Sequence, residues 1–395
     1  MSGVIHIITS MERGGAQRHT LETAARLHDP ARPQLLITGA PGPLDDEARL
    51  RLGSRFLQVP ALQNPIGFHD VAALLDLSRL LAREVQRLRP PVVVHTNSSK
   101  AGVLGRMAAK TVSGVVVVHT VHGFGLEALG PRRSWLLEAA EKSVATLAAR
   151  TVFVSEADRQ RAIELGLASD RSALLIRSGV DVAHYAELPE KSAARRALNV
   201  DVKGPVILTL ANCKPQKDPI FHIEIFRAVV DRDPSARCLF VGDGPLRPQV
   251  EDRIDALGLR DHVQLHGFVD DVRPFLAAAD VFLLASAWEG LPRTVLEATA
   301  AGLPCVVRDT GWAADVAFAR SITALPALPR DSADADAFAI ALLKKHRVVP
   351  KKLPREFTQD GMLEALRDLY DELCGPVIDD EERIRMLRRR RRLRR

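Results

Sequence analysis

Residues 187–210 read ELPEKSAARRALNVDVKGPVILTL, a polar stretch that ends in the apolar run Val206–Leu210. On both sides of this stretch, short apolar runs rich in β-branched residues alternate with longer amphipathic segments. Strands that alternate with helices predict a parallel sheet covered by helices on both faces. Two such series predict an α/β protein with two Rossmann-like, doubly wound domains.

The apolar runs place five strands in each series. They are Val4–Ile8, Leu35–Ile37, Val92–His95, Val115–Val118 and Thr151–Val154, then Val206–Leu210, Ala236–Val241, His262–Leu265, Val281–Leu284 and Pro304–Val307. Helices are expected at Gln17–Leu27, Phe68–Leu88 and Thr358–Leu373, whereas strand signals end after about Asp315. We therefore expect domains at 1–186 and 204–357, a linker at 187–203, a last helix within 358–375 and a tail at 376–395.

The composition indicates an ordered protein with two large cores, because 46% of its 395 residues are hydrophobic. No apolar run is long enough to cross a bilayer, and the N-terminal MSGVIHIITS lacks the features of a secretory signal. The four cysteines lie far apart without a CxxC pair, which is typical of a reduced, cytoplasmic protein.

The net charge of +6 comes mostly from the C-terminus. Arg383–Arg395 contains nine arginines, and four acids precede it at 379–382; removing both groups lowers the net charge from +6 to +1. A nearly neutral body argues against nucleic acid as a partner. The tail is either a solvated, disordered end or an attachment to anionic lipid, which would place the enzyme peripherally on the inner face of the membrane.

In the first series, three strand ends carry residues suited to ligand binding. Gly14-Gly15 precedes a helix, where backbone N–H groups can approach a phosphate or sugar, although such a turn is as often structural. His122-Gly123 either reaches into a cleft or bonds to a loop backbone. The cluster around Asn97, Ser98 and Lys100 either lines the same cleft or, more simply, caps the next helix through Ser98 or Ser99.

In the second series, Asn212, Lys214 and Lys217 follow the first strand. The two lysines can hold a diphosphate as point charges, or they form a solvated basic loop. Two glycine turns follow, at which backbone could meet a nucleotide. They contain Gly242 and Gly244, and Gly267, Phe268 and Val269.

The most informative stretch is Glu289-Gly290-Leu291-Pro292-Arg293-Thr294-Val295-Leu296-Glu297. One carboxylate lies in a loop and the other lies eight positions later in the helix that the loop opens. The helix N-terminus between them favours an anion. A sugar nucleotide needs this order of groups: acceptors for sugar hydroxyls, an anion site, then an acceptor for ribose hydroxyls.

Together these motifs resemble the retaining glycosyltransferases of the GT-B fold, most closely glycosyltransferase family 4. The resemblance covers about residues 3–373 and is most specific from Phe240 to Pro304. It implies two domains that face each other across a cleft, with the nucleotide-sugar donor bound mainly by the second domain and the acceptor by the first. It also implies that the last helix, Thr358–Leu373, packs back on the first domain.

The resemblance assigns roles to individual residues. Glu297 would bind the ribose, Glu289 the hydroxyls of the transferred sugar, and Lys217 the diphosphate in place of a metal ion, so neither a metal nor another cofactor is expected. The remaining donor-side residues would be Gly14, Gly15, Asn212, Lys214, Gly242, Gly244, Gly267, Phe268, Val269, Gly290, Leu291 and Pro292. The acceptor-side residues would be Gln17, Asn97, Ser98, Lys100 and His122, and His122 would also touch the donor sugar.

One position departs from the family pattern. Members often carry an arginine five positions before the phosphate lysine, and this chain has Asn212 there, so Lys214 is expected to supply the missing charge. The implied reaction transfers a hexose-type unit from a nucleoside diphosphate sugar, UDP- or GDP-linked, to a hydroxyl of a glycan or lipid-linked glycan, as in bacterial envelope polysaccharide synthesis. The alternatives are a GT-B sugar-nucleotide epimerase or hydrolase, and a non-catalytic sugar-nucleotide-binding subunit.

Overall fold

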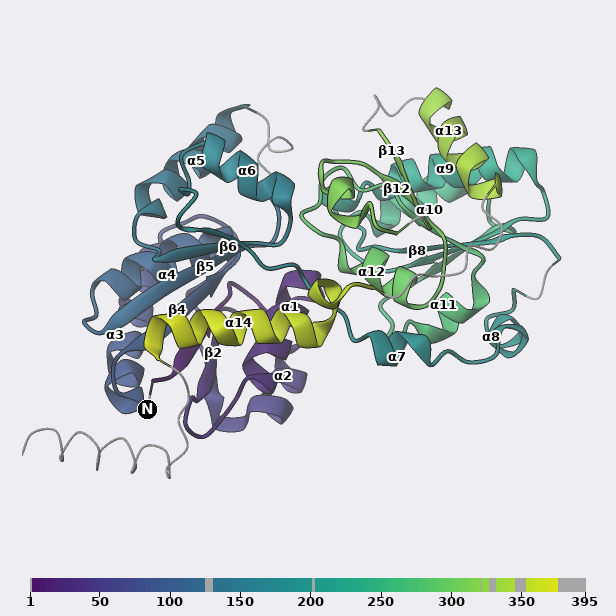
Figure 1. Cartoon of the computed structure of the whole chain (residues 1–395). Helices are drawn as coiled ribbons and strands as arrows, with labels where there is room; N and C mark the ends of the chain where they lie inside the picture. The colour runs from purple at the N-terminus through teal and green to yellow at the C-terminus, as the bar shows by residue number, and fades with distance from the viewer. Residues whose placement is uncertain are drawn as a thin grey trace, which may run out of the picture.

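The computed structural model describes residues 2–124, 131–200, 203–319, 321–326, 332–344 and 353–375. The expected tail at 376–395, with Arg383–Arg395, lies outside the described residues. The chain forms two parallel sheets, each flanked by helices, that lie side by side (Figure 1). Two Rossmann-like halves, as expected from the sequence, are thus confirmed.

The first sheet has seven strands in the order β3-β2-β1-β4-β5-β6-β7, and every pairing within it is parallel. Its strands are β1 Val4–Ile7, β2 Gln34–Thr38, β3 Phe56–Gln58, β4 Val92–Asn97, β5 Val115–Val121, β6 Arg150–Phe153 and β7 Ala173–Leu175. Its helices are α1 Gly15–Arg26, α2 Asp45–Leu52, α3 His69–Leu88, α4 Ser99–Lys110, α5 Pro131–Ala145 and α6 Glu156–Glu164.

The second sheet has six parallel strands in the order β10-β9-β8-β11-β12-β13. Its strands are β8 Val206–Leu210, β9 Arg237–Val241, β10 Val263–His266, β11 Val281–Leu284, β12 Cys305–Arg308 and β13 Ile322–Leu325. The helices that follow β7 are α7 Val182–Ala186, α8 Lys191–Ala197, α9 Pro219–Arg232, α10 Arg247–Ala256, α11 Arg273–Ala278, α12 Arg293–Ala300, α13 Ser332–Lys344 and α14 Gln359–Cys374.

Three short strands, β3, β7 and β13, were not predicted from the sequence. Each lies at or near a sheet edge and has three or four residues. The expectation that strands end after about Asp315 was wrong, because β13 pairs with β12 from Ile322 to Leu325. Edge strands are buried on fewer sides, so their sequences need less apolar character.

Alternating residues of β1 build the core of the first half on both faces of its sheet. Ile5 and Ile7 pack in a cluster with Leu77 of α3, whereas Val4 packs with α14 on the opposite face. Helix α14, shown in yellow in Figure 1, lies across the first half and buries five side chains there. These are Met362, Leu363, Leu366, Leu369 and Tyr370.

The chain passes between the halves at two adjacent places. Val180 N–H donates to Phe357 O at 3.1 Å, and Gln359 N–H donates to Val180 O at 2.9 Å. The segment expected as a linker at 187–203 contains α8 instead of a simple connection. Arg195 of α8 donates to the carbonyl of Ala278 at 3.0 Å, so this helix is attached to the second half.

Candidate active site

A cavity of about 870 Å³ lies between the two halves. The strand order reverses between β1 and β4 in the first sheet and between β8 and β11 in the second. Loops that leave these strands line the cavity, among them those with Gly14, Ser98, Asn212 and Glu289. Open parallel sheets bind ligands where their strand order reverses, because two helix-forming loops diverge there. The places where the strand order reverses in the two sheets therefore both face this cavity.

Two glycines bring the halves into backbone contact beside the cavity. A Cβ atom on Gly290 would lie 2.5 Å from the carbonyl oxygen of His122, and one on Gly123 would lie 2.8 Å from Gly290 N. Gly123 also has a φ of 139°, which disfavours any residue with a side chain. Only glycine allows this approach, which places His122 against the loop that carries Glu289.

Lys217 and Glu289 form an ion pair in the second half. Lys217 follows β8, and Glu289 follows the neighbouring strand β11, so parallel pairing of these strands brings the two loops together. Gln216 adds a weaker contact from Nε2 to a Glu289 carboxylate oxygen at 3.4 Å. The Glu289 side chain is 7% exposed and that of Lys217 is 19% exposed. The pair is therefore largely shielded from water but borders the cavity.

Two further polar contacts join the β8–α9 loop to the first half. Lys214 forms an ion pair with Glu12, and Asn212 Nδ2 donates to the backbone oxygen of Arg13 at 2.9 Å. Lys214 was expected to compensate for the missing arginine at position 212. In this structure its charge is matched by the carboxylate of Glu12, and Asn212 holds the loop before α1.

Glu297 lies one helical turn into α12 and is partly buried at the cavity. Burial raises the pKa of its carboxyl group, while the charge of Arg293 and a hydrogen bond from the Tyr185 hydroxyl lower that pKa in part. Tyr185 belongs to α7, in the segment that joins the sheets, and also lines the cavity. Nothing in the sequence around Tyr185 indicated that its hydroxyl would contact Glu297 at the cavity.

His122 is a neutral hydrogen-bond acceptor at neutral pH. Burial, with a contribution from the charge of Arg293, lowers its pKa to about 4. Asn97 Nδ2 donates to His95 O at 3.3 Å, which directs Asn97 Oδ1 toward His122 Nε2 at 3.0 Å. Nε2 therefore carries the proton, and Nδ1 is left with a lone pair.

The structure brings most of the predicted site residues together. Those that line the cavity are Gly14, Gly15, Gln17, Ser98, His122, Asn212, Lys214, Lys217, Gly242, Phe268, Val269, Glu289, Leu291, Pro292 and Glu297. Predicted residues outside the lining are Asn97, Lys100, Gly244, Gly267 and Gly290. Lys100 is held by Asp70, with Nζ 2.6 Å from a carboxylate oxygen, which directs its charge to the start of α3.

The expected capping role of Ser98 was wrong. Ser98 occupies the N-cap position of α4, but its side chain accepts no backbone hydrogen bond there. Its φ of 69° differs from that of ordinary N-caps. Instead Thr9, at the end of β1, accepts the N–H of Ala101 at 3.2 Å, and its hydroxyl contacts the Ser98 hydroxyl at 2.8 Å.

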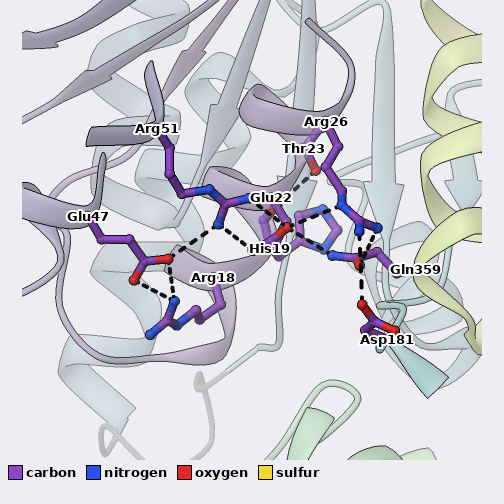
Figure 2. A network of polar contacts seen from close by, with 9 residues as sticks. All are labelled: Arg18, His19, Glu22, Thr23, Arg26, Glu47, Arg51, Asp181 and Gln359. Atoms are coloured by element: carbon purple, nitrogen blue, oxygen red, sulfur yellow. Dashed lines mark hydrogen bonds and ion pairs between the residues drawn. The ribbon is translucent and has the colours of Figure 1, made fainter. Parts of the chain in front are cut away.

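A network of ion pairs lines the first-half wall and was not indicated by the sequence (Figure 2). Arg51 binds Glu22 at 2.5 Å, and Arg18 binds Glu47 at 2.6 Å. Arg26 donates to Gln359 at 2.6 Å. The network ties α1 and α2 to the start of α14, where the chain returns from the second half. Its partners come from distant segments, so no local pattern could have revealed them.

Within the part of the chain that the structure describes, no three histidine, cysteine, aspartate or glutamate side chains are grouped so as to hold a metal ion. None of the described helices is long and apolar enough to span a bilayer.

Comparison with known proteins gives the family. Residues 14–176 match a glycosyl transferase 4-like domain, and residues 190–361 match the glycosyl transferases group 1. An Escherichia coli protein named UDP-Gal:alpha-D-GlcNAc-diphosphoundecaprenol alpha-1,3-galactosyltransferase is 30% identical over 315 residues, which cover 77% of this chain and 78% of that protein. The chain belongs to the group 1 glycosyltransferases.

Solved structures place this glycosyltransferase in the GT-B fold. A glycosyltransferase from Rickettsia africae superimposes with a TM-score of 0.70 at 19% identity, covering 94% of this chain and 98% of that one. HepE from Anabaena, in complex with UDP and glucose, superimposes with a TM-score of 0.69 at 18% identity, covering 95% of this chain and 96% of that one. The glycosyltransferase family and the GT-B fold that the resemblance indicated are therefore confirmed.

Proposed function

We propose that this glycosyltransferase transfers a hexose-type unit from a UDP- or GDP-linked sugar to an acceptor hydroxyl, with retention at the anomeric carbon. The observation that carries the proposal is the convergence of Lys217, Glu289 and Glu297 on one cavity around the start of α12. Glu289 would bind hydroxyls of the transferred sugar and Glu297 those of the ribose. The E. coli relative, named for a UDP-Gal donor, favours UDP over GDP.

The donor diphosphate would displace Glu289 as the partner of Lys217. Before binding, this ion pair satisfies two largely buried charges. With donor bound, the lysine would face the diphosphate and the carboxylate would accept hydrogen bonds from sugar hydroxyls. Preorganised positive charge at the leaving group lowers the barrier because it stabilises the charge that develops as the sugar departs.

Retention would follow from attack on the face from which the diphosphate leaves. The acceptor oxygen forms the new bond to the anomeric carbon as the bond to the diphosphate oxygen breaks, and the acceptor proton passes to the departing diphosphate. The lone pair on His122 Nδ1 would accept a hydrogen bond from a sugar hydroxyl. The protein mainly positions the two reactants.

We infer that the acceptor is a lipid-linked glycan. The E. coli relative is named for a diphosphoundecaprenol acceptor. In this chain, Ile66, Phe68, Val71 and Leu75 form an apolar patch at the start of α3, with exposures of 92, 99, 62 and 50%. Such concentration of exposed apolar side chains is typical of an interaction surface.

A hydrogen bond links the segment just before the patch to the cavity wall. The neighbouring Asn64 donates from Nδ2 to Glu12 Oε1 at 2.7 Å, and Glu12 lines the cavity. A glycan that enters between the halves would thus keep its lipid carrier near this patch. Contact with the bilayer through the patch, with the Arg-rich tail adding attraction to anionic lipid, would make the enzyme peripheral at the cytoplasmic leaflet.

Flotation with vesicles that contain anionic lipid tests this location. Four proteins should be compared: the full chain, Ile66→Ser with Phe68→Ser, a chain that ends at Gly375, and the combination. We expect the patch variant to bind the vesicles less at both low and high salt. The truncated chain should bind them less at low salt only, because salt screens the attraction between arginines and anionic lipid. Equal binding by all four would refute the membrane proposal and leave the enzymatic one standing.

The enzymatic proposal is tested by incubating UDP- and GDP-hexoses with and without lipid-linked glycan acceptors. Acceptor-dependent release of nucleoside diphosphate, with a product of unchanged anomeric configuration by NMR, is the expected result. Release or epimerisation without acceptor would indicate the hydrolase or epimerase alternative. Donor binding without turnover across the acceptor panel would indicate a non-catalytic subunit.

A further inference from the structure

Among the described lysine and arginine side chains that line the cavity, all but one have a carboxylate partner. Six lysine and arginine side chains of the lining each have a carboxylate within 4 Å. They are Arg13 with Asp270, Arg18 with Glu47, Arg26 with Glu22, Arg51 with Glu22, Lys214 with Glu12 and Lys217 with Glu289. Arg293 also lines the cavity, and no carboxylate of the described residues lies within 4 Å of it, although its charge acts on the carboxyl group of Glu297.

Arg293 is the first residue of α12, and its guanidinium is only partly satisfied. Its Nη1 atom is buried and has no hydrogen-bond partner among the described residues. A buried nitrogen of a cation that has no hydrogen-bond partner is costly, so a bound anion at this place would stabilise it. The position of Arg293 at a helix N-terminus adds to the positive potential instead of offsetting it.

The side chain of Arg293 reaches the first half. Its Cδ atom lies 3.4 Å from the point that a Cβ on Gly15 would occupy, so it covers the start of α1. Helix α1 has twelve residues, and its N-cap Gly14 provides no side-chain cap, which leaves N–H groups at this end for a ligand. Two helix N-termini and one cation therefore converge from opposite halves.

The neighbouring histidines carry no charge that could balance the charge of Arg293, and one of them lacks hydrogen-bond partners. His19 is 2% exposed, and neither of its ring nitrogens has a hydrogen-bond partner among the described residues. Its ring lies against that of His122 with centroids 4.9 Å apart. Burial, followed by the charges of His122 and Arg293, lowers the pKa of His19 well below its usual range. Both imidazoles are thus neutral around a cationic guanidinium.

We propose that Arg293 binds the diphosphate of the donor together with Lys217. This inference rests on the proposed function and adds a residue to it. The diphosphate would then lie between Lys217 on one side and Arg293 on the other. A planar guanidinium suits this role because it can donate two parallel hydrogen bonds to phosphate oxygens.

Arg293 would also couple donor binding to closure of the cleft. It belongs to the second half, and it covers the start of α1 in the first half. A phosphate bound to both the guanidinium and the free N–H groups of α1 joins the halves at the reacting centre. Arg293 is thus assigned to the leaving group, and the acceptor hydroxyl would approach the same face of the sugar from the side of the first half.

Binding of UDP, GDP, UMP and GMP to the purified full chain, measured by calorimetry, tests the assignment directly. With Arg293→Gln, affinity for the diphosphate that wild type binds should fall at least about tenfold, because charge-assisted hydrogen bonds to phosphate are lost. Affinity for the corresponding monophosphate should change little. Arg293→Lys should give an intermediate loss. Arg227→Gln, on α9 and paired with Asp231, is the control that leaves nucleotide binding unchanged.

Thermal unfolding without ligand separates this role from a structural one. Because Arg293 Nη1 has no hydrogen-bond partner and no carboxylate of the described residues lies within 4 Å of the guanidinium, Arg293→Gln should be about as stable as wild type. A clear loss of stability would show that the guanidinium supports the fold and would overturn the proposal. Unchanged diphosphate binding, or a rise only in the acceptor KM, would also overturn it. If wild type itself bound no nucleoside diphosphate, the proposed function would fail before this inference was reached.

Discussion

The Lys217 ammonium and the Glu289 carboxylate hold each other in a largely buried ion pair at the wall of the inter-half cavity. When the donor binds, Lys217 is proposed to exchange the carboxylate for the diphosphate. Glu289 is proposed to exchange the ammonium for hydroxyls of the sugar. The free enzyme therefore keeps both groups in place without leaving either charge unsatisfied.

Loss of Lys217 should harm activity far more than loss of Lys214. Lys217→Ala should lower kcat/KM about 100-fold or more, because one preorganised donor at a developing anion contributes on that scale. Lys214→Ala should lower it less than about tenfold, since Lys214 is half exposed and bound to Glu12. Steady-state kinetics with circular dichroism as a folding control measures both. Equal losses, or none for Lys217→Ala, would contradict the assignment.

The two glutamates should have separable effects on donor use. Glu289→Gln should lower kcat, because it weakens contacts to the transferred sugar, whereas Glu297→Gln should mainly raise the KM for the donor through the ribose. Tyr185→Phe, which removes the hydroxyl that donates to Glu297, should reproduce a small part of the second effect. Kinetics with varied donor concentration tests this. Near-wild-type activity in both glutamate variants would show that the donor binds elsewhere.

The contact between Gly123 and Gly290 should be essential for closure. Gly123→Ala would place a methyl group 2.8 Å from Gly290 N, so the halves must separate and kcat/KM should fall about tenfold or more. Gly258→Ala is the matched control, because that residue also has positive φ but has nothing within 4 Å of its would-be Cβ. Similar activity in the two variants would mean that backbone strain, and not the contact, decides the outcome.

Buried histidines should make the protein unstable in acid. Burial lowers the pKa of His6 and His222 from 6.5 to about 4, and that of His95 and His119 well below 6.5. Between pH 6.5 and 4 the unfolded chain thus binds more protons than the folded protein, and the free energy of unfolding falls as pH falls. Each histidine contributes about 1.4 kcal/mol per pH unit in this window.

Asp158 opposes this trend, since burial raises the pKa of its carboxyl group to about 6 and the folded protein takes up that proton first. Burial also raises the pKa of Glu141 and Glu297, which act in the same direction. The buried histidines outnumber these three carboxyl groups, so the free energy of unfolding should still rise with pH. Urea unfolding curves at pH 7.5, 6.5, 5.5 and 4.5 measure the slope. A free energy of unfolding that stays constant from pH 6.5 to 4.5 would show that these imidazoles are not neutral in the folded protein.

Activity should survive removal of divalent metal ions. Lys217 and Arg293 are proposed to meet the diphosphate, and their positive charge serves the purpose for which other transferases use a metal. The enzyme should therefore show the same kcat/KM in EDTA as in Mg²⁺ or Mn²⁺. Loss of activity in EDTA that either ion restores would contradict this expectation and would shift the leaving-group role to a metal.

The sequence by itself determined the two series of parallel strands and the stretches that follow them. Val206–Leu210 and Val281–Leu284 became β8 and β11 with the bounds expected, because buried strands are apolar throughout and their signal is local. The positions of Glu289 and Glu297 around the start of α12 followed for the same reason. Both residues belong to one loop and the helix it opens, so short-range geometry places them.

Tertiary structure alone decided which groups meet across the cleft. The approach of Gly123 to Gly290, the pairing of Lys214 with Glu12 and the isolation of Arg293 depend on how two separately formed halves dock. Their partners lie far apart along the chain, and no propensity or periodicity encodes such docking. The charge that the sequence assigned to Lys214 is therefore balanced by Glu12, whereas Arg293 has no carboxylate of the described residues within 4 Å.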